Sequence, residues 1–214
     1  MESITKEEGI LVLDNIIKVI QENKQYLSDI DGAIGDGDHG INMNKGFSMC
    51  REELVQHPGD LPHGLNLLSR VLMMKIGGSM GPLYGKFFKG MSTSLAGNET
   101  INAQSFGEAL RASEEAIRSI SEARVGDKTL VDALYPAIDA FNSAIESEGG
   151  FGGALLVMKS AAEKGRDSTE DMVAKIGRSS RLGERSRGVV DAGAASCALL
   201  LGVMTDAIVE LLDN

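Results

Sequence analysis

The chain has 214 residues, of which 21 are Lys or Arg and 31 are Asp or Glu, so its formal net charge at pH 7 is −10. This acidic balance argues against unaided binding to nucleic acid or to an anionic membrane surface. Cys50 and Cys197 are the only cysteines and form no Cys-x-x-Cys pair, which disfavours both a disulfide framework and a cysteine zinc site.

The N-terminal segment begins with a helix start signal. Thr5 and Glu8 have the spacing of a capping box, and an apolar stripe at helical spacing begins at Ile10. Acidic residues precede that stripe, unlike in a signal peptide, and no run of about 18 apolar residues occurs anywhere in the chain. We therefore expect a soluble, cytoplasmic protein.

Helical spacing of apolar residues continues along almost the whole chain, and strand-like alternation is absent. Ser168, with Asp171 three residues on, is expected to cap one further short segment. The pattern predicts a single all-α domain over residues 1–214 with eight or nine helices. The later stripes cover 41–54, 61–72, 83–91, 106–120, 130–145, 153–164 and 194–211.

Glycine gathers in the breaks between these stripes. The glycine-containing breaks are 32–40, 77–85, 126 and 177–193. Because glycine is poorly suited to helix interiors and well suited to tight turns, we expect four loops that converge at one end of a helical bundle.

The first of these loops, DGAIGDGDHG at 31–40, carries Asp31, Asp36 and Asp38. It matches the G-x-G-x-x-G pattern, but no strand precedes it and its carboxylates would repel a pyrophosphate unless a cation lay between them. Hard carboxylate oxygens on a flexible backbone suit Mg²⁺, whereas Phe47 stands where an EF-hand would need its glutamate. The alternative is a helix-capping turn in which Asp38 caps a helix that begins near Ile41.

The second and fourth loops both suit an anionic ligand. Residues 77–82, GGSMGP, place small residues and a proline at a helix start, which is a ready phosphate site or an ordinary turn between packed helices. Residues 177–188 contain four arginines, which favour a bound anion or form a solvated basic loop. These arginines are Arg178, Arg181, Arg185 and Arg187.

The third loop is GDKT at 126–129. Asp127 is expected to cap the apolar helix that follows, and Lys128 and Asp132 are candidates for either the site or the surface. No Walker A motif and no G-x-S-x-G motif occurs in the chain, so neither a P-loop nor a serine-hydrolase mechanism is indicated.

The order and spacing of the four loops resemble one known family. DGAIGDGDHGINMNKGF, GGSMGPLYG, GDKT with Asp132, and GRSSRLGERSRG followed by DAGA are similar to the DhaL family of nucleotide-binding subunits of bacterial dihydroxyacetone kinases. The resemblance covers essentially the whole chain. It implies an antiparallel barrel of eight α-helices with the nucleotide site in the interhelical loops at one end.

The resemblance also implies the ligands and the residues that bind them. ADP or ATP and two Mg²⁺ ions are the expected cofactors, with Asp31, Asp36 and Asp38 as metal ligands. Arg178 is the expected catalytic residue and contacts the outer phosphate. The other implied nucleotide-binding residues are His39, Gly40, Ile41, Asn42, Ser79, Met80, Ser121, Leu130, Asp191, Ala192 and Gly193.

The reaction implied by the resemblance is a relay. A phosphohistidine on a DhaM-like partner, supplied from phosphoenolpyruvate, phosphorylates the bound ADP, and the ATP formed phosphorylates dihydroxyacetone on a DhaK-like partner. Two alternatives stay open: an ATP-dependent kinase subunit for a related ketose or sugar derivative, and a nucleotide-loaded protein that signals to a transcription regulator. Neither nucleic acid nor a membrane is an expected partner, and a homodimer stays open.

The chain departs from the family pattern at three positions. Ala192 stands where the family has a proline, Ser121 stands where a glycine is expected, and Leu130 replaces the usual methionine. Loss of the proline predicts a looser 191–194 loop.

Overall fold

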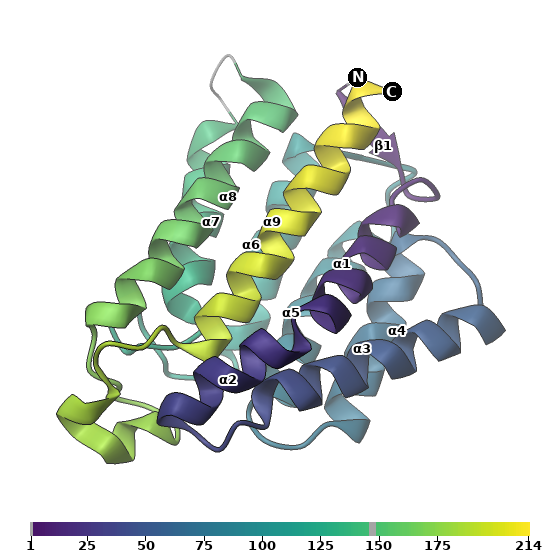
Figure 1. Cartoon of the computed structure of the whole chain (residues 1–214). Helices are drawn as coiled ribbons and strands as arrows, with labels where there is room; N and C mark the ends of the chain where they lie inside the picture. The colour runs from purple at the N-terminus through teal and green to yellow at the C-terminus, as the bar shows by residue number, and fades with distance from the viewer. Residues whose placement is uncertain (1, 146–148) are drawn as a thin grey trace.

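The computed structural model describes residues 2–145 and 149–214, and these form an almost entirely helical domain (Figure 1). The α-helices are α1 (Ile10–Glu22), α2 (Lys24–Ile34), α3 (His39–Gln56), α4 (Leu61–Lys75), α5 (Met80–Leu95), α6 (Ala103–Arg118), α7 (Val131–Ala144), α8 (Gly150–Ser168) and α9 (Ala192–Asp213). Two short 3₁₀ helices lie between α8 and α9, η1 (Thr169–Asp171) and η2 (Ser179–Ser186).

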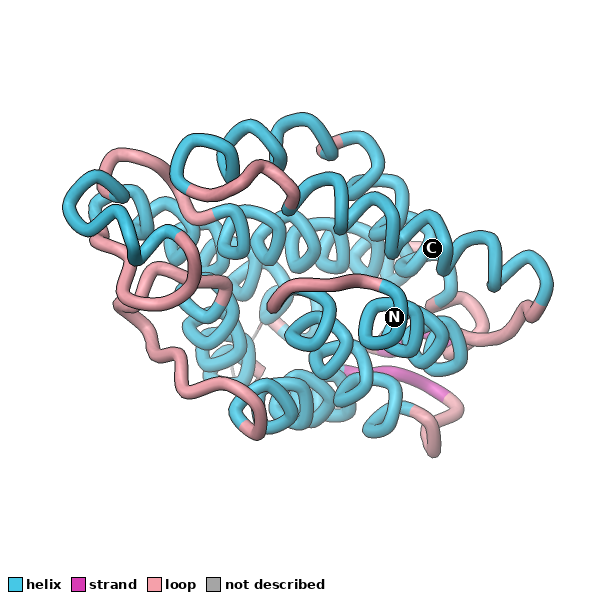
Figure 2. Tube along the Cα trace, turned by 90° about the horizontal axis from the view of Figure 1, so that it is seen from below, coloured by secondary structure: helices cyan, strands magenta, loops and turns pink. Residues whose placement is uncertain are grey.

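The α-helices are arranged as a closed ring. Each helix from α2 to α9 packs against the next one along the chain, and α1 packs against both α9 and α3, which closes the barrel. Figure 2 views this arrangement from below, the end at which the long connecting loops gather. The predicted all-α barrel is therefore confirmed. The described residues contain nine α-helices, and one of them, α2, was not predicted by any apolar stripe.

The apolar stripes explain why the helices close on one another. All six phenylalanines are buried, and they form two groups inside the barrel. Phe87 and Phe88 pack edge to face, with ring centroids 5.0 Å apart, and Phe106 and Phe141 do so at 5.3 Å in the other half. Such geometry adds roughly 0.5–1.5 kcal/mol per pair to the apolar area that is buried.

Helix α9 is the most apolar element. Among the described residues it is the one helix that is long and apolar enough to cross a membrane, but 67% of the relevant window is buried inside the protein. It packs against α1, α7 and α8. Its composition is therefore that of a central core helix, which is apolar on all sides.

A small strand pair corrects the expectation that the chain has no strands. β1 (Ser3–Thr5) pairs antiparallel with β2 (Thr100–Asn102), with Ile4 opposite Ile101. Both isoleucines are buried. Strands of three residues are too short to show an alternating pattern, so this pairing has no signal in the sequence.

The two predicted helix starts outside the site had different outcomes. The hydrogen bonds of the Thr5–Glu8 box are present, because the Thr5 amide donates to Glu8 (2.9 Å) and the Glu8 amide donates to Thr5 (3.1 Å). They do not cap α1, which begins at Ile10 with Gly9 as its N-cap. Ser168 as a cap is wrong: α8 continues to Ser168, whose hydroxyl donates to the carbonyl of Gly165 (2.7 Å). The 3₁₀ turn η1 follows directly, with no side-chain cap.

Candidate functional site: a cavity at four helix N-termini

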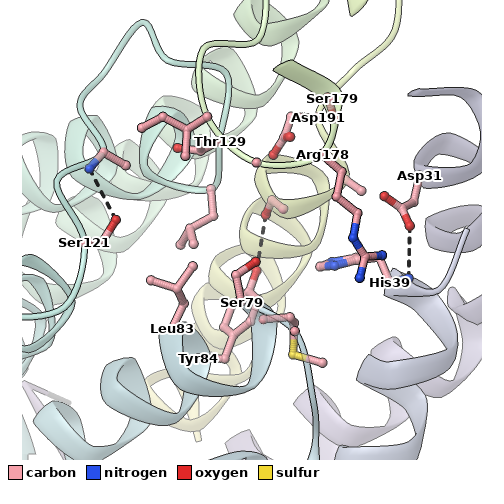
Figure 3. A pocket seen from close by; sticks show the side chains of 18 of the residues that line it. Asp31, His39, Ser79, Leu83, Tyr84, Ser121, Thr129, Arg178, Ser179 and Asp191 are labelled. Carbon is pink, nitrogen blue, oxygen red and sulfur yellow. Dashed lines mark hydrogen bonds between the residues drawn. The ribbon is translucent and has the colours of Figure 1, made fainter. Parts of the chain in front are cut away.

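Four helices begin at one cavity of about 380 Å³ (Figure 3). They are α3, α5, α7 and α9, each of which places residues of its first turn on the cavity wall. Helix N-termini carry partial positive charge and unsatisfied backbone N–H groups. At α5 no side chain caps the helix, which leaves amides of its first turn available. The cavity is therefore suited to an anion.

Three carboxylates lie along one side of this cavity. Asp31 lies in the last turn of α2, so that residues 31–34 of the predicted loop are helical, and Asp36 and Asp38 lie in the connection to α3. One oxygen from each of the three lies within 4.8 Å of the other two. The alternative role of Asp38 as a helix cap is wrong, because its side chain accepts no cap hydrogen bond. Its backbone is already near-helical (φ −90°, ψ −10°), whereas a capping aspartate needs an extended backbone.

The acidic group fits a divalent cation. Its donors are hard oxygens, all three residues are at least partly open to the cavity, and the set matches the ligands that Mg²⁺ prefers. A cationic group already lies among them: the guanidinium of Arg178 contacts Asp36 and lies 3.5 Å from Asp38. Figure 3 shows the Arg178 side chain beside Asp31 and His39. The carboxylates therefore attract positive charge to this position.

Only one of the four arginines in 177–188 lines the cavity. Arg178 does so, whereas Arg181, Arg185 and Arg187 do not. Arg187 instead bonds the carbonyl of Asp171 and pairs with Glu184 (3.3 Å). Of the four arginines that were candidates to bind an anion, Arg178 is therefore the one whose position suits that role.

A buried hydrogen-bond chain supports the wall next to the carboxylates. The His39 ring nitrogen Nε2 is hydrogen-bonded to the Ser196 hydroxyl (2.9 Å), which is also hydrogen-bonded to the Tyr84 hydroxyl (2.7 Å). The His39 backbone amide donates to Asp31 (3.2 Å). Burial lowers the pKa of His39 to about 4, against the opposing effect of the Asp31 charge, so the imidazole is neutral at pH 7. The chain joins α3, α5 and α9 directly behind the site.

The opposite side of the cavity is mainly apolar. Leu83, Ile120 and Leu130 line it, and Figure 3 shows Leu83 on the same side as Ser121. The Ser121 hydroxyl accepts a hydrogen bond from the amide of Ala123 (3.2 Å). The cavity therefore has a charged side and an apolar side, an arrangement that suits a ligand with an anionic end and a flat apolar end.

Asp191 forms the start of α9. Its carboxylate accepts from the amide of Ala194 (2.8 Å), so it is the N-cap. Burial raises the pKa of Asp191 to about 7, although its hydrogen bonds to backbone amides and the Lys128 charge lower it. The expected looser loop at 191–194 is not a loop at all, because 192–194 form the first turn of α9.

The GDKT segment is arranged differently from the prediction. Asp127 does not cap α7; its carboxylate accepts from the amide of Arg124 (2.8 Å). Asp132, inside the first turn, accepts from the amides of Gly126 (2.5 Å) and Thr129 (2.7 Å). The capping prediction was wrong because α7 begins only at Val131, so Leu130 is its N-cap and Asp127 lies three residues before that position.

All but two of the residues predicted for the site line the cavity. Gly40 and Ile41 do not: Gly40 is buried against α2, and Ile41 is 52% exposed. The lining residues are Asp31, Asp36, Asp38, His39, Asn42, Ser79, Met80, Ser121, Leu130, Arg178, Asp191, Ala192 and Gly193.

Sequence reasoning missed several cavity residues. Tyr84 and Leu83 belong to the apolar stripe of α5, and nothing local distinguishes them from core residues. Ile120 and Ile176 stand next to Ser121 and Gly177, so their position at the edge of a loop could have indicated that they line the cavity. Lys128 and Thr129 belong to the GDKT loop and line the cavity, but the sequence analysis left Lys128 open between site and surface and gave Thr129 no role.

Comparison with known proteins gives consistent matches. The DAK2 domain family matches residues 33–206. The ADP-binding subunit DhaL of PEP-dependent dihydroxyacetone kinase 1 from Listeria innocua serovar 6a is 37% identical over 93% of this chain and 95% of its own. The corresponding DhaL subunit from Escherichia coli strain K12 is 32% identical over 94% of this chain and 97% of its own.

Solved structures agree on the fold. The native dihydroxyacetone kinase of C. freundii matches with a TM-score of 0.70 and 22% identity, over 91% of this chain and 33% of that chain. The same kinase in complex with AMP-PNP and Mg²⁺ matches with a TM-score of 0.66 and 21% identity. The chain thus corresponds to about a third of that kinase.

Proposed function

The chain belongs to the DAK2-domain family, and from that premise we propose that it is the DhaL-type, ADP-binding subunit of a phosphoenolpyruvate-dependent dihydroxyacetone kinase. Its similarity to curated DhaL subunits extends over nearly the full length of both chains. The ligand of the cavity would be a nucleoside di- or triphosphate bound together with Mg²⁺.

One observation carries this proposal: three carboxylates line a cavity at which four helices begin. Carboxylates and phosphates repel each other, and a divalent cation between them turns the repulsion into binding. A phosphate bound at the helix ends would be repelled by the carboxylates without that ion. A magnesium-bound polyphosphate satisfies both.

The residues then divide by role. Asp31, Asp36 and Asp38 would hold up to two Mg²⁺ ions, which when bound neutralise phosphate charge. Arg178, proposed as the catalytic residue, would contact the outer phosphate, because its guanidinium can donate two parallel hydrogen bonds to phosphate oxygens. The amides at the start of α5, at Ser79 and Met80, would bind phosphate oxygens as well.

The apolar side would bind the base. Leu130, with Ser121 at its edge, would form the adenine pocket together with Leu83. Asp191, Ala192 and Gly193 would form the far wall, and neutral His39 with Asn42 would adjoin the phosphates and ribose. This division follows the polarity of the cavity, with charge at one side and apolar surface at the other.

Positioning is the main chemical contribution of this chain. Phosphoryl transfer needs the donor and acceptor oxygens aligned and their charge neutralised, and it requires little covalent chemistry from the protein. The partners would be a DhaM-like phosphohistidine donor and a DhaK-like subunit that binds dihydroxyacetone. We place the complex in the cytoplasm. Contact with a transcription regulator and formation of a homodimer are secondary expectations.

A second acceptor class has support from the relatives. Kinases named for erythrulose are also similar to this chain, for example the L-erythrulose kinase of Pectobacterium atrosepticum, which is 29% identical over 87% of this chain and 32% of its own. A related ketose and free ATP would then replace dihydroxyacetone and the phosphohistidine relay. Retention of the nucleotide separates the two functions.

Native mass spectrometry of the protein purified without added nucleotide tests the proposal. We expect ADP and magnesium to be retained, and Asp36→Asn to lose them. Asp29→Asn is the control, because Asp29 is exposed on α2 and lies outside the cavity. An empty protein that exchanges Mg·ATP freely would favour the ketose kinase. Absence of any Mg²⁺-dependent nucleotide binding by calorimetry would overturn both functions.

A further inference from the structure

Lys128 is a buried cation with three backbone acceptors. Only 1% of the residue is exposed. Its ammonium donates to the carbonyl oxygens of Thr169 (2.6 Å), Met172 (3.2 Å) and Val189 (2.6 Å). An ammonium has three donors, so all of them are used. Lysine is seldom fully buried, and this one needs an explanation.

The backbone conformation does not explain why a lysine is present at position 128. Lys128 has φ of 62° and is the one non-glycine residue with positive φ among the described residues. Glycine or asparagine adopts that conformation at lower cost. In addition, no carboxylate of the described residues forms an ion pair with Lys128, and burial lowers its pKa. Both costs point to a requirement for this particular side chain.

The three acceptors lie at the two ends of one segment. Thr169 and Met172 precede the turn that carries Arg178, and Val189 follows it. Between them, residues 175–178 are exposed, and η2 contacts α2. Lys128 therefore joins both ends of the 169–191 segment to the start of α7, and it is one of the residues that line the cavity.

We propose that Lys128 is a positioning residue that acts through Arg178: it holds the two ends of the 169–191 segment together, so that Arg178 extends across the cavity to the acidic loop. In the nucleotide-binding function proposed above, on which this inference rests, Lys128 sets the phosphate contact of Arg178 without touching the phosphate itself. It would thereby control the preference for ADP over a nucleoside without phosphates.

The test compares Lys128→Met with Lys175→Met. Methionine has nearly the length of lysine and cannot donate a hydrogen bond. Lys175 lies in the same segment, but its side chain is 64% exposed and pairs with Asp127 at 3.4 Å. Hydrogen exchange of the ligand-free proteins is measured first. We expect amides of residues 172–189 to lose protection in Lys128→Met and to keep it in Lys175→Met, while the helices stay protected.

Affinities for Mg·ADP and for adenosine are measured next. We expect Lys128→Met to weaken Mg·ADP binding by about tenfold, as for the loss of one charged hydrogen bond, and to leave adenosine binding unchanged. In an Arg178→Gln background the same substitution should have little further effect. Equal losses for the two ligands, or effects that add fully to those of Arg178→Gln, would overturn the proposal.

Two further variants keep the inference testable if Lys128→Met does not fold. Lys128→Arg retains a charged donor and should restore both amide protection and the preference for Mg·ADP, whereas Lys128→Gln, which is neutral and shorter, should restore neither. If the wild-type protein bound no nucleotide, the proposed function would fail. The exchange measurement would still decide whether Lys128 orders the segment, and unchanged protection would refute that step.

Discussion

The guanidinium of Arg178 lies 3.5 Å from the carboxylate of Asp38, although the two residues stand 140 positions apart in the sequence. It also contacts Asp36. The Arg178 guanidinium therefore lies among the carboxylates that we propose as Mg²⁺ ligands. In the proposed function the arginine and a metal ion would compete for the same oxygens, and binding of metal with nucleotide would release Arg178 toward the phosphates.

Replacing Arg178 with glutamine should strengthen the binding of metal alone. An exposed ion pair contributes roughly 0.2–1 kcal/mol, so we expect the affinity for Mn²⁺ without nucleotide to rise by up to about fivefold. The affinity for Mg·ADP should fall, because the phosphate loses its guanidinium. Mn²⁺ titration followed by electron paramagnetic resonance measures the first effect. Arg181→Gln, outside the cavity, is the control; an Mn²⁺ affinity equal to wild type in Arg178→Gln would contradict the competition.

Substitution of Ala192 by proline should stabilise the protein. Ala192 is the first residue of α9, where proline is favoured, and the extended backbone of Asp191 (ψ 130°) is compatible with a following proline. We expect the free energy of unfolding to rise by roughly 0.4–1 kcal/mol, measured by urea denaturation. Ala195→Pro is the matched control, since its amide donates to Asp191 (2.9 Å). That variant should lose about 3 kcal/mol; destabilisation by Ala192→Pro would refute the assignment of Ala192 to this position.

Gly40 should prove to be a packing residue. A Cβ atom at Gly40 would lie 2.1 Å from the carbonyl oxygen of Lys24, so α3 approaches α2 more closely than any larger residue permits. Gly40→Ala should therefore lower the free energy of unfolding by about 1–3 kcal/mol, with a lower melting temperature in calorimetry.

Gly152→Ala is the control for Gly40, because Gly152 lies in the first turn of α8 and a Cβ there would meet nothing within 4 Å. It should raise the free energy of unfolding by roughly 0.5–1 kcal/mol. If Gly40→Ala kept full stability and lost only nucleotide binding, Gly40 would be a binding residue instead.

Asp191 should make stability depend on pH. Its pKa is raised from 3.8 to about 7 in the folded state, so between these values the folded protein binds the extra proton. The stabilisation is fully present below the unfolded pKa and is lost as pH rises through 7. The stability of wild type relative to Asp191→Asn should therefore fall between pH 4 and 7, by at most about 1.4 kcal/mol per pH unit. Urea denaturation at several pH values measures it, and a difference independent of pH would refute the raised pKa.

The helices and the acidic loop were predictable because their signals are local. Helical spacing of apolar residues identified every α-helix of the described residues except α2 to within a few residues, since one buried face repeats along each helix. Asp31, Asp36 and Asp38 stand close together in the sequence, so a shared site needed no knowledge of the fold. The order of the four glycine-rich loops then carried the resemblance to the DhaL family, and with it half of the residues that line the cavity.

The remaining features depend on contacts between segments that are far apart in the sequence. Packing of the barrel decided that Arg178 and not its neighbours reaches the carboxylates, and that Lys128 meets Thr169 and Val189. It also placed Tyr84 behind His39 and left Gly40 against α2. The sequence alone determined most of the helices and which side chains have the chemistry of metal or phosphate ligands. Only the tertiary structure decided which of them meet, because the direction and depth of each side chain follow from how the nine helices pack.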